Sequence, residues 1–232
     1  VGSIDHPFMK PGNTSAPAGV ILMTADKGLA GAFNSNVIRA GEQFARDNKN
    51  EVAWYTVGVK ARNAVRRMGK TDRPTWAINV QDKLELAREV AQRVSDDFVN
   101  GKISSIVLIS SKLVSMLSQK PETRQLVPIT REDVIVDADA PKVAKGAVEF
   151  SPSPEFVLSR LLPKYVEFTI FSAILETDAA FFAAQLIAMN NATDNAGKLI
   201  DELTIQMNNA RQAAITKELL EIVGGAEALV NG

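Results

Sequence analysis

The stretch "MNNARQAAITKELLEIVGGAEAL" (207–229) closes the chain with residues that favour a helix and include neither proline nor an aromatic ring. Its apolar residues recur at spacings of four, three, four and three, along Ile215, Leu219, Ile222, Ala226 and Leu229. This 3.5-residue period is typical of a coiled coil. The stretch therefore predicts a helix whose apolar stripe packs against another helix.

The helical pattern extends far upstream of this stretch. Pro163 is the last proline of the chain, and Gly197 is the only glycine between it and Gly224. A single helix over 163–232 would be roughly 100 Å long at 1.5 Å per residue. A weaker seam continues upstream through Ala192, Ala196, Leu199, Leu203, Met207, Ala210 and Ala214. Because isolated helices depend mainly on packing for stability, this helix is expected to need a partner.

Residues 18–150 alternate between strand-like and helix-like patterns. Strands are predicted at "AGVILMT" (18–24), "EVAWYTVG" (51–58) and "SSIVLISS" (104–111), and helices at 34–48, 59–69 and 82–99. Helix caps are expected at Asn34 or Ser35 and at Asp82. "QLVPITRED" (125–133) and "VIVD" (134–137) favour edge strands.

This alternation predicts an α/β fold, with a small Rossmann-like sheet domain followed by a very long carboxy-terminal helix. The expected divisions are a flexible lead-in (1–17), the α/β domain (18–150), a connector (151–162) and the long helix (163–232).

Composition excludes several classes of function. The 232 residues are 46% hydrophobic with a net charge of −1, which gives no global basic field for nucleic acid. There is no cysteine. The only histidine, His6, is interpreted as an exposed residue without a functional role, in a mobile amino-terminal segment. No metal site or cofactor is therefore expected. No apolar run approaches the ~20 residues that span a bilayer, so we expect no direct membrane insertion.

The turn "TADKGLAGAFN" (24–34) lies where α/β proteins often bind phosphates, between a strand and a helix. It contains only GxxG, and it lacks the GK[ST] ending of a phosphate loop. Two glycines in such a turn more often serve tight packing. The charged residues elsewhere are interpreted as solvated surface, namely the basic cluster Arg62, Arg66, Arg67 and Lys70 and the acidic pairs Asp96–Asp97 and Glu132–Asp133.

Two stretches resemble the gamma subunit of F-type ATP synthases. "ILMTADKGLAGAFNSNVIR" (21–39) is similar to that family's first strand and turn, and "AMNNATDNAGKLIDELTIQMNNARQAAITKELLEIVGGAEAL" (188–229) is similar to its carboxy-terminal signature. "LLPKYVEFTIFSAILET" (161–177) resembles the segment between them that leads into the signature. The resemblance covers essentially the whole chain.

The resemblance implies a non-catalytic rotor shaft in a proton-translocating complex. Its implied partners are the alpha and beta subunits of a catalytic hexamer, the epsilon subunit and the membrane ring of c subunits. In the family, an Arg-Gln pair and a nearby Thr contact a beta subunit, and the matching residues here are Arg211, Gln212 and Thr216. Because organelle-specific features such as the redox-switch insertion of chloroplast members are absent, the expected location is the cytoplasmic face of a bacterial plasma membrane.

The sequence departs from the family pattern in three places. The family chain begins with another long helix, antiparallel to the carboxy-terminal one, and nothing here matches it. The family usually has an arginine at Gln185 and a glutamate near Phe181, so a contact to beta is expected to be weaker. Ala30 replaces a common cysteine.

Two alternatives remain open from the residues alone. One is an α/β ligand-binding domain or enzyme that uses the 24–34 turn and carries a coiled-coil oligomerisation stalk. The other is a generic coiled-coil scaffold.

Overall fold

A computed structural model describes residues 6–48, 51–70, 74–129 and 154–230, with side chains of the last segment described over 156–226. The chain forms two compact units, 1–186 and 187–232, and the helix α5 (Pro154–Val230) runs through both. The expected strand "VIVD" (134–137) and the pair Glu132–Asp133 lie outside the described residues.

The first unit is built on a five-stranded sheet in the order β3-β2-β1-β4-β5. Its strands are β1 (Ala18–Met23), β2 (Val52–Val57), β3 (Thr75–Trp76), β4 (Ile106–Ser115) and β5 (Ser118–Val127). Strand β1 pairs in parallel with β2 and β4, β3 pairs in parallel with β2, and β5 returns antiparallel to β4 as an edge strand. The expected mixed α/β class is confirmed.

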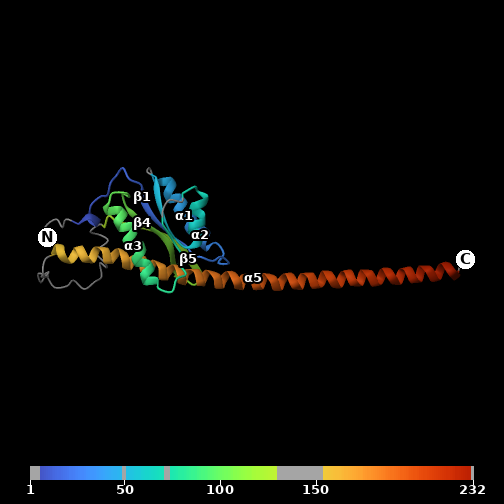
Figure 1. The fold of residues 1–232 in the computed structure, drawn as a ribbon. Helices are drawn as coiled ribbons and strands as arrows, with labels where there is room; N and C mark the ends of the chain where they lie inside the picture. The colour runs from blue at the N-terminus through green and yellow to red at the C-terminus, as the bar shows by residue number, and fades with distance from the viewer. Residues whose placement is uncertain (1–5, 49–50, 71–73, 130–153, 231–232) are drawn as a thin grey trace. The chain divides into compact units, whose positions relative to one another are not determined.

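Helices cover both faces of this sheet (Figure 1). Helices α1 (Phe33–Asp47) and α2 (Val59–Arg67) cover one face, where Val37, Ala61 and Val65 pack against Val20 and Trp54. Helix α3 (Lys83–Val99) and the beginning of α5 cover the other face. Strand β1 is buried along its whole length, which agrees with its uninterrupted apolar sequence.

The long helix begins at Pro154, earlier than the expected start at Pro163. Pro154 can occupy a first turn because its missing N–H would be unpaired there. Pro163 lies inside the helix, and the expected connector is helical from residue 154 onwards. The helix continues through Pro163 because packing stabilises it there. Leu162, Val166 and Ile170 are all buried in the core of the first unit.

By length and mean hydropathy, α5 also meets the criteria for a membrane span. However, 44% of its most apolar window is buried inside the protein, and the core helix of a soluble protein meets the same criteria. The sequence reasoning missed this because it counted only uninterrupted apolar runs.

Two local expectations are corrected by side-chain contacts. The N-cap of α1 is Ala32, without a side-chain hydrogen bond, whereas Asp82 caps α3 by accepting from the Glu85 N–H as expected. His6 is half-buried rather than free, and its Nδ1 accepts a hydrogen bond from the Phe8 N–H at the start of the 3-10 helix η1 (Pro7–Met9). Burial lowers the pKa of His6.

Asp97 is buried, contrary to the expected solvated pair with Asp96. Its carboxylate accepts from Tyr55 Oη at 2.8 Å and faces Arg93 Nε at 3.1 Å and Lys102 Nζ at 3.2 Å. Burial by itself raises the pKa of Asp97, but the hydrogen bonds from Tyr55 and Lys102 and the charges of Arg93 and Lys102 outweigh it. The resulting pKa lies below its ordinary value.

Because the folded-state pKa of Asp97 is depressed, its ionised form stabilises the fold above the unfolded-state pKa of about 3.9. This stabilisation is lost as the pH falls below that value through the folded-state pKa. We expect Asp97→Asn to lower the free energy of unfolding by about 3 kcal/mol at pH 7 and to flatten its decline below pH 4. Urea unfolding at pH 7, 4 and 3 measures both effects. A decline as steep in Asp97→Asn as in the wild type would exclude this account.

Gly58 is required by the close approach of two strand ends. Its φ is +100°, and an added Cβ would lie 2.0 Å from the Thr24 carbonyl oxygen. We expect Gly58→Ala to lower the free energy of unfolding by about 2 kcal/mol or more. Alanine disfavours the positive φ, and its Cβ would clash with the Thr24 carbonyl oxygen. Gly197→Ala is the matched control, since an added Cβ meets nothing within 4 Å there and α-helix propensity favours alanine by about 0.5–1 kcal/mol. Equal losses in the two variants would contradict the prediction.

Candidate functional site

The turn after β1 is held by hydrogen bonds within the protein. The Asp26 carboxylate accepts three backbone N–H groups, from Val59 at 2.8 Å, Ile78 at 3.2 Å and Asn79 at 2.9 Å. Thr24 Oγ1 accepts from the Ala61 N–H at 2.7 Å. The turn thereby fixes the start of α2 and the segment after β3, which assigns it a structural role.

Asn34 fastens the same turn instead of capping α1. Its side-chain oxygen accepts from the Ala25 N–H, and its amide nitrogen donates to the Lys27 carbonyl, each at 3.0 Å. Leu29, which lies between Lys27 and Asn34 in the chain, has a φ of 61° and is 76% exposed. The turn thus exposes an apolar side chain, while Asn34 joins the Ala25 N–H and the Lys27 carbonyl within it.

A polar chain, here called the brace, connects this turn to α5 through Asp26, Lys83 and Asp178. Lys83 Nζ lies 2.6 Å from Asp178 Oδ2 and also donates to the Ile78 carbonyl. The Ile78 N–H in turn donates to Asp26. Both members of the ion pair are largely shielded, with side-chain exposures of 19% and 27%. The brace therefore connects the sheet's end to the first part of α5.

A small hydrophobic cluster reinforces the brace. Phe181 on α5 packs against Phe33, with ring centroids 5.8 Å apart, and against Ala25 and Ala30. Phe181, which stands near an expected family glutamate, is thus buried inside the first unit, and Ala30 is buried with it. Gln185 is half-buried.

The second unit contains the residues expected to contact a beta subunit. From Met189 to Ala226, every residue except Asn208 is exposed. Arg211, Gln212 and Thr216 all lie on this exposed helix, and Thr216 Oγ1 donates to the Gln212 carbonyl at 2.9 Å. Gln212 and Thr216 share one side because they are one helical turn apart.

The expected coiled-coil seam is also exposed. Ile215, Leu219, Ile222 and Ala226 lie open on α5, and Leu229 belongs to the helix although its side chain is outside the described range. Leu199, Leu203 and Met207 are likewise more than half exposed. Within the second unit, these apolar side chains have no tertiary packing among the described residues.

Sequence reasoning missed a further apolar stripe on the first part of α5. Leu161, Phe168, Leu175 and Phe182 follow one another at seven-residue intervals, and all four are exposed. The opposite face of the same segment is buried in the sheet domain. The seven-residue spacing is visible in the sequence. However, Leu161, where the stripe begins, falls in the segment 151–162 that was predicted to be a connector rather than a helix.

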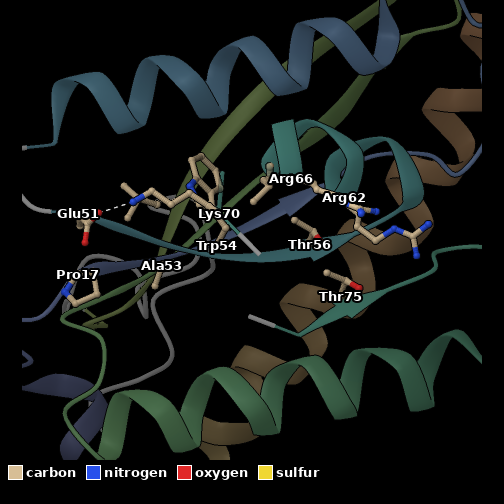
Figure 2. A pocket seen from close by; sticks show the side chains of 11 residues that line it. Pro17, Glu51, Ala53, Trp54, Thr56, Arg62, Arg66, Lys70 and Thr75 are labelled. Atoms are coloured by element: carbon tan, nitrogen blue, oxygen red, sulfur yellow. Dashed lines mark hydrogen bonds and ion pairs between the residues drawn. The ribbon is translucent and has the colours of Figure 1, made fainter. Parts of the chain in front are cut away.

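The part of the chain that the structure describes contains no group of three His, Asp or Glu side chains arranged to hold a metal ion. Three members of the basic cluster, Arg62, Arg66 and Lys70, line a cavity at the sheet edge, shown in Figure 2.

Comparison with known proteins places this arrangement in a class. A family model described as ATP synthase matches residues 1–229. An ATP synthase gamma chain of Phenylobacterium zucineum is 41% identical over 216 residues, covering 90% of this chain and 73% of its own. One of Heliobacterium modesticaldum is 39% identical, covering 97% of this chain and 78% of its own. The fold and the match define a subunit of an ATP synthase.

Solved structures agree on the fold. The mitochondrial ATP synthase structure of Euglena gracilis that contains F1 and the c-ring includes a chain with a TM-score of 0.68 at 19% identity, covering 93% of this chain and 73% of that one. The central-stalk structure of Tetrahymena thermophila includes one with a TM-score of 0.60 at 21% identity, covering 79% and 80%. The chain belongs to the ATP synthase gamma-chain family. It spans about three quarters of the length of these bacterial relatives.

The role of the Asp26 carboxylate in stability can be tested by substitution. Asp26→Asn keeps the size of the side chain but replaces one of two acceptor oxygens with a donor that faces backbone N–H groups. We expect it to lower the free energy of unfolding by about 2 kcal/mol, because hydrogen bonds to a charged acceptor are strong and the partly buried Val59 and Ile78 N–H groups depend on this carboxylate. Urea unfolding followed by tryptophan fluorescence provides the measurement.

Asp201→Asn is the control for this variant. Asp201 is exposed on α5, so its substitution should change stability by no more than about 0.5 kcal/mol. If Asp26→Asn were as harmless as Asp201→Asn, the carboxylate would not hold the turn.

Proposed function

We propose that this chain is the rotor shaft of a proton-translocating F-type ATP synthase and transmits rotation of a membrane ring to a catalytic hexamer. The observation that carries the proposal is the exposed, aromatic-free part of α5, from Met189 to Ala226, in a member of this family. Large aromatic side chains dominate interface energetics and would anchor a shaft to one wall. Small and amide side chains allow it to turn.

Arg211, Gln212 and Thr216 provide contacts for one beta subunit at a time. An arginine fork pairs with a carboxylate through two hydrogen bonds and releases it without breaking a packed apolar surface. The exposed Gln212 and Thr216 add hydrogen-bonding groups on one side of the helix. Rotation brings these groups to successive beta subunits, and such coupling works through different contacts with alternative states.

A second helix, antiparallel to α5, covers the exposed apolar stripes. Its contacts follow the seam from Leu199 to Ile222 and the stripe from Leu161 to Phe182. An unpaired single helix with this many exposed leucines and isoleucines would be marginal in water. The seven-residue repeat favours packing of the coiled-coil type.

The chain performs no chemistry itself on this proposal. Catalytic sites belong to other subunits, and the partners are the alpha and beta subunits, the epsilon subunit and the ring of c subunits. Solved structures with a similar fold support the assignment, since one is of a central stalk with its c-ring and another is of a rotor. The complex acts at the cytoplasmic face of a bacterial plasma membrane, and α5 does not enter the bilayer. The side chains of Thr24, Asp26 and Asn34 in the 24–34 turn already hydrogen-bond to backbone groups of the protein, which weakens the ligand-binding alternative.

Co-assembly tests the proposal. The chain, joined to the amino-terminal helix of a bacterial relative, is mixed with purified alpha and beta subunits, and complex mass and ATP hydrolysis are measured. We expect one copy in a six-subunit ring. Arg211→Ala or Gln212→Ala should slow turnover by about tenfold, corresponding to about 1.4 kcal/mol of lost stabilisation.

Lys217→Ala is the control on the same helix. It removes an exposed charge that belongs to an i,i+4 pair with Glu221, outside the three contact residues, so turnover should stay close to that of the wild type. Absence of any complex would refute the shaft proposal. If a complex forms and Arg211→Ala, Gln212→Ala and Lys217→Ala all hydrolyse ATP equally fast, the shaft proposal stands. Only the assignment of the contact residues would then be refuted.

A further inference from the structure

A cavity of about 670 Å³ lies at the sheet edge, between strand β2 and helix α2. Val52, Trp54 and Thr56 of β2 line it from the strand, and Arg62 and Arg66 line it from the helix. Figure 2 shows Arg62, Thr56 and Thr75 together at one end of the cavity and the Glu51–Lys70 pair at the other. The volume is within the range of ~300–1,000 Å³ that is typical of small-molecule sites.

The charge around this cavity is not balanced. Lys70 is paired with Glu51, so these two lining charges neutralise each other. Arg62 and Arg66 have no ion-pair partner among the residues that the structure describes. Two guanidinium charges therefore face one cavity in a chain whose net charge is −1.

A buried hydroxyl group lies at the same place. Thr56 is 1% exposed, and its Oγ1 has no hydrogen-bond partner within the described part of the chain. A buried hydroxyl without a partner costs about as much as a lost hydrogen bond, so native proteins rarely keep one. Thr75 stands opposite Thr56 in the register between β2 and β3 and also lines the cavity. Two hydroxyl groups are thus combined with two guanidinium groups.

We propose that this cavity binds a phosphate monoester through Arg62, Arg66, Thr56 and Thr75. A monoester dianion matches the two unpaired positive charges, and its three terminal oxygens match guanidinium and hydroxyl donors. The exposed Arg62 side chain turns to admit the phosphate, and Thr56 Oγ1 then donates to a phosphate oxygen. The remaining volume holds the organic part of the ligand. This site does not depend on the rotor function.

Trp54 serves as a built-in reporter because it lines the cavity and is one of only two tryptophans. In a Trp76→Phe background, its fluorescence is titrated with glycerol 3-phosphate, AMP and orthophosphate at constant ionic strength. Vesicles containing phosphatidic acid test a lipid source of the same group, and succinate tests a carboxylate dianion. Calorimetry on the same samples detects binding that leaves the fluorescence unchanged. We expect saturable binding of at least one monoester, from the soluble or the lipid source, and weaker binding of succinate.

Variants distinguish specific binding in the cavity from nonspecific attraction of anions to the basic helix α2. Arg62→Gln and Arg66→Gln should each weaken binding about tenfold or more, since each removes charge-assisted hydrogen bonds. Thr56→Val should weaken it several-fold while leaving the melting temperature unchanged or raised, because it removes an unpaired buried hydroxyl at nearly constant volume. Arg67→Gln is the control, since Arg67 lies on the same helix but does not line this cavity.

Three results would overturn the proposal. They are the absence of saturable binding by both methods, equal losses in Arg67→Gln and Arg62→Gln, and wild-type affinity in Thr56→Val. Succinate binding as tight as that of the monoesters would overturn the assignment to phosphate.

Discussion

The burial of one face of α5 in the α/β core is the interaction on which the rest of the structure depends. Leu162, Val166, Ile170 and Ile174 lie in the same core as the residues of β1, β2 and α3. Burying a large aliphatic side chain stabilises a fold by about 1.5–3 kcal/mol, so four of them fix the helix firmly to the sheet. This burial stabilises the first part of α5, whereas the exposed part from Met189 onwards gains no such packing from the described residues.

Hydrophobic burial alone would leave the angle of the helix about its own axis loosely specified, and the polar contacts complete the definition. The pair of Lys83 and Asp178 acts at one point and the pair of Arg88 and Glu167 at another, both between α3 and α5. The first is largely shielded from water and is screened less than a surface pair. For the proposed rotor shaft, resistance to rotation of α5 within the first unit is the required property. The brace supplies it with directional contacts that a smooth apolar face lacks.

The sequence predicted what depends on local pattern. The buried strand β1, the helix over 83–99 with its Asp82 cap, and the long proline-free run of α5 after Pro163 all follow from spacing and composition. It failed where residues distant in the chain meet. Asp26 binds backbone groups more than 30 and more than 50 positions away, and nothing near Asp26 indicates them. The pattern predicts a cap at Asn34 or Ser35, yet both polar atoms of the Asn34 side chain bind backbone groups of the turn.

The same limit explains the errors about exposure. Asp97 stands beside Asp96 in a charged stretch and reads as surface, but Tyr55, from a strand 42 positions away, reaches its carboxylate. Phe181 reads as a departure in a contact surface, but it is the aromatic partner of Phe33. Near the position where the family resemblance implies a glutamate, the structure has an aromatic contact within the first unit. Phe181 is 6% exposed, so it stabilises the first unit from inside and presents no charge at the surface.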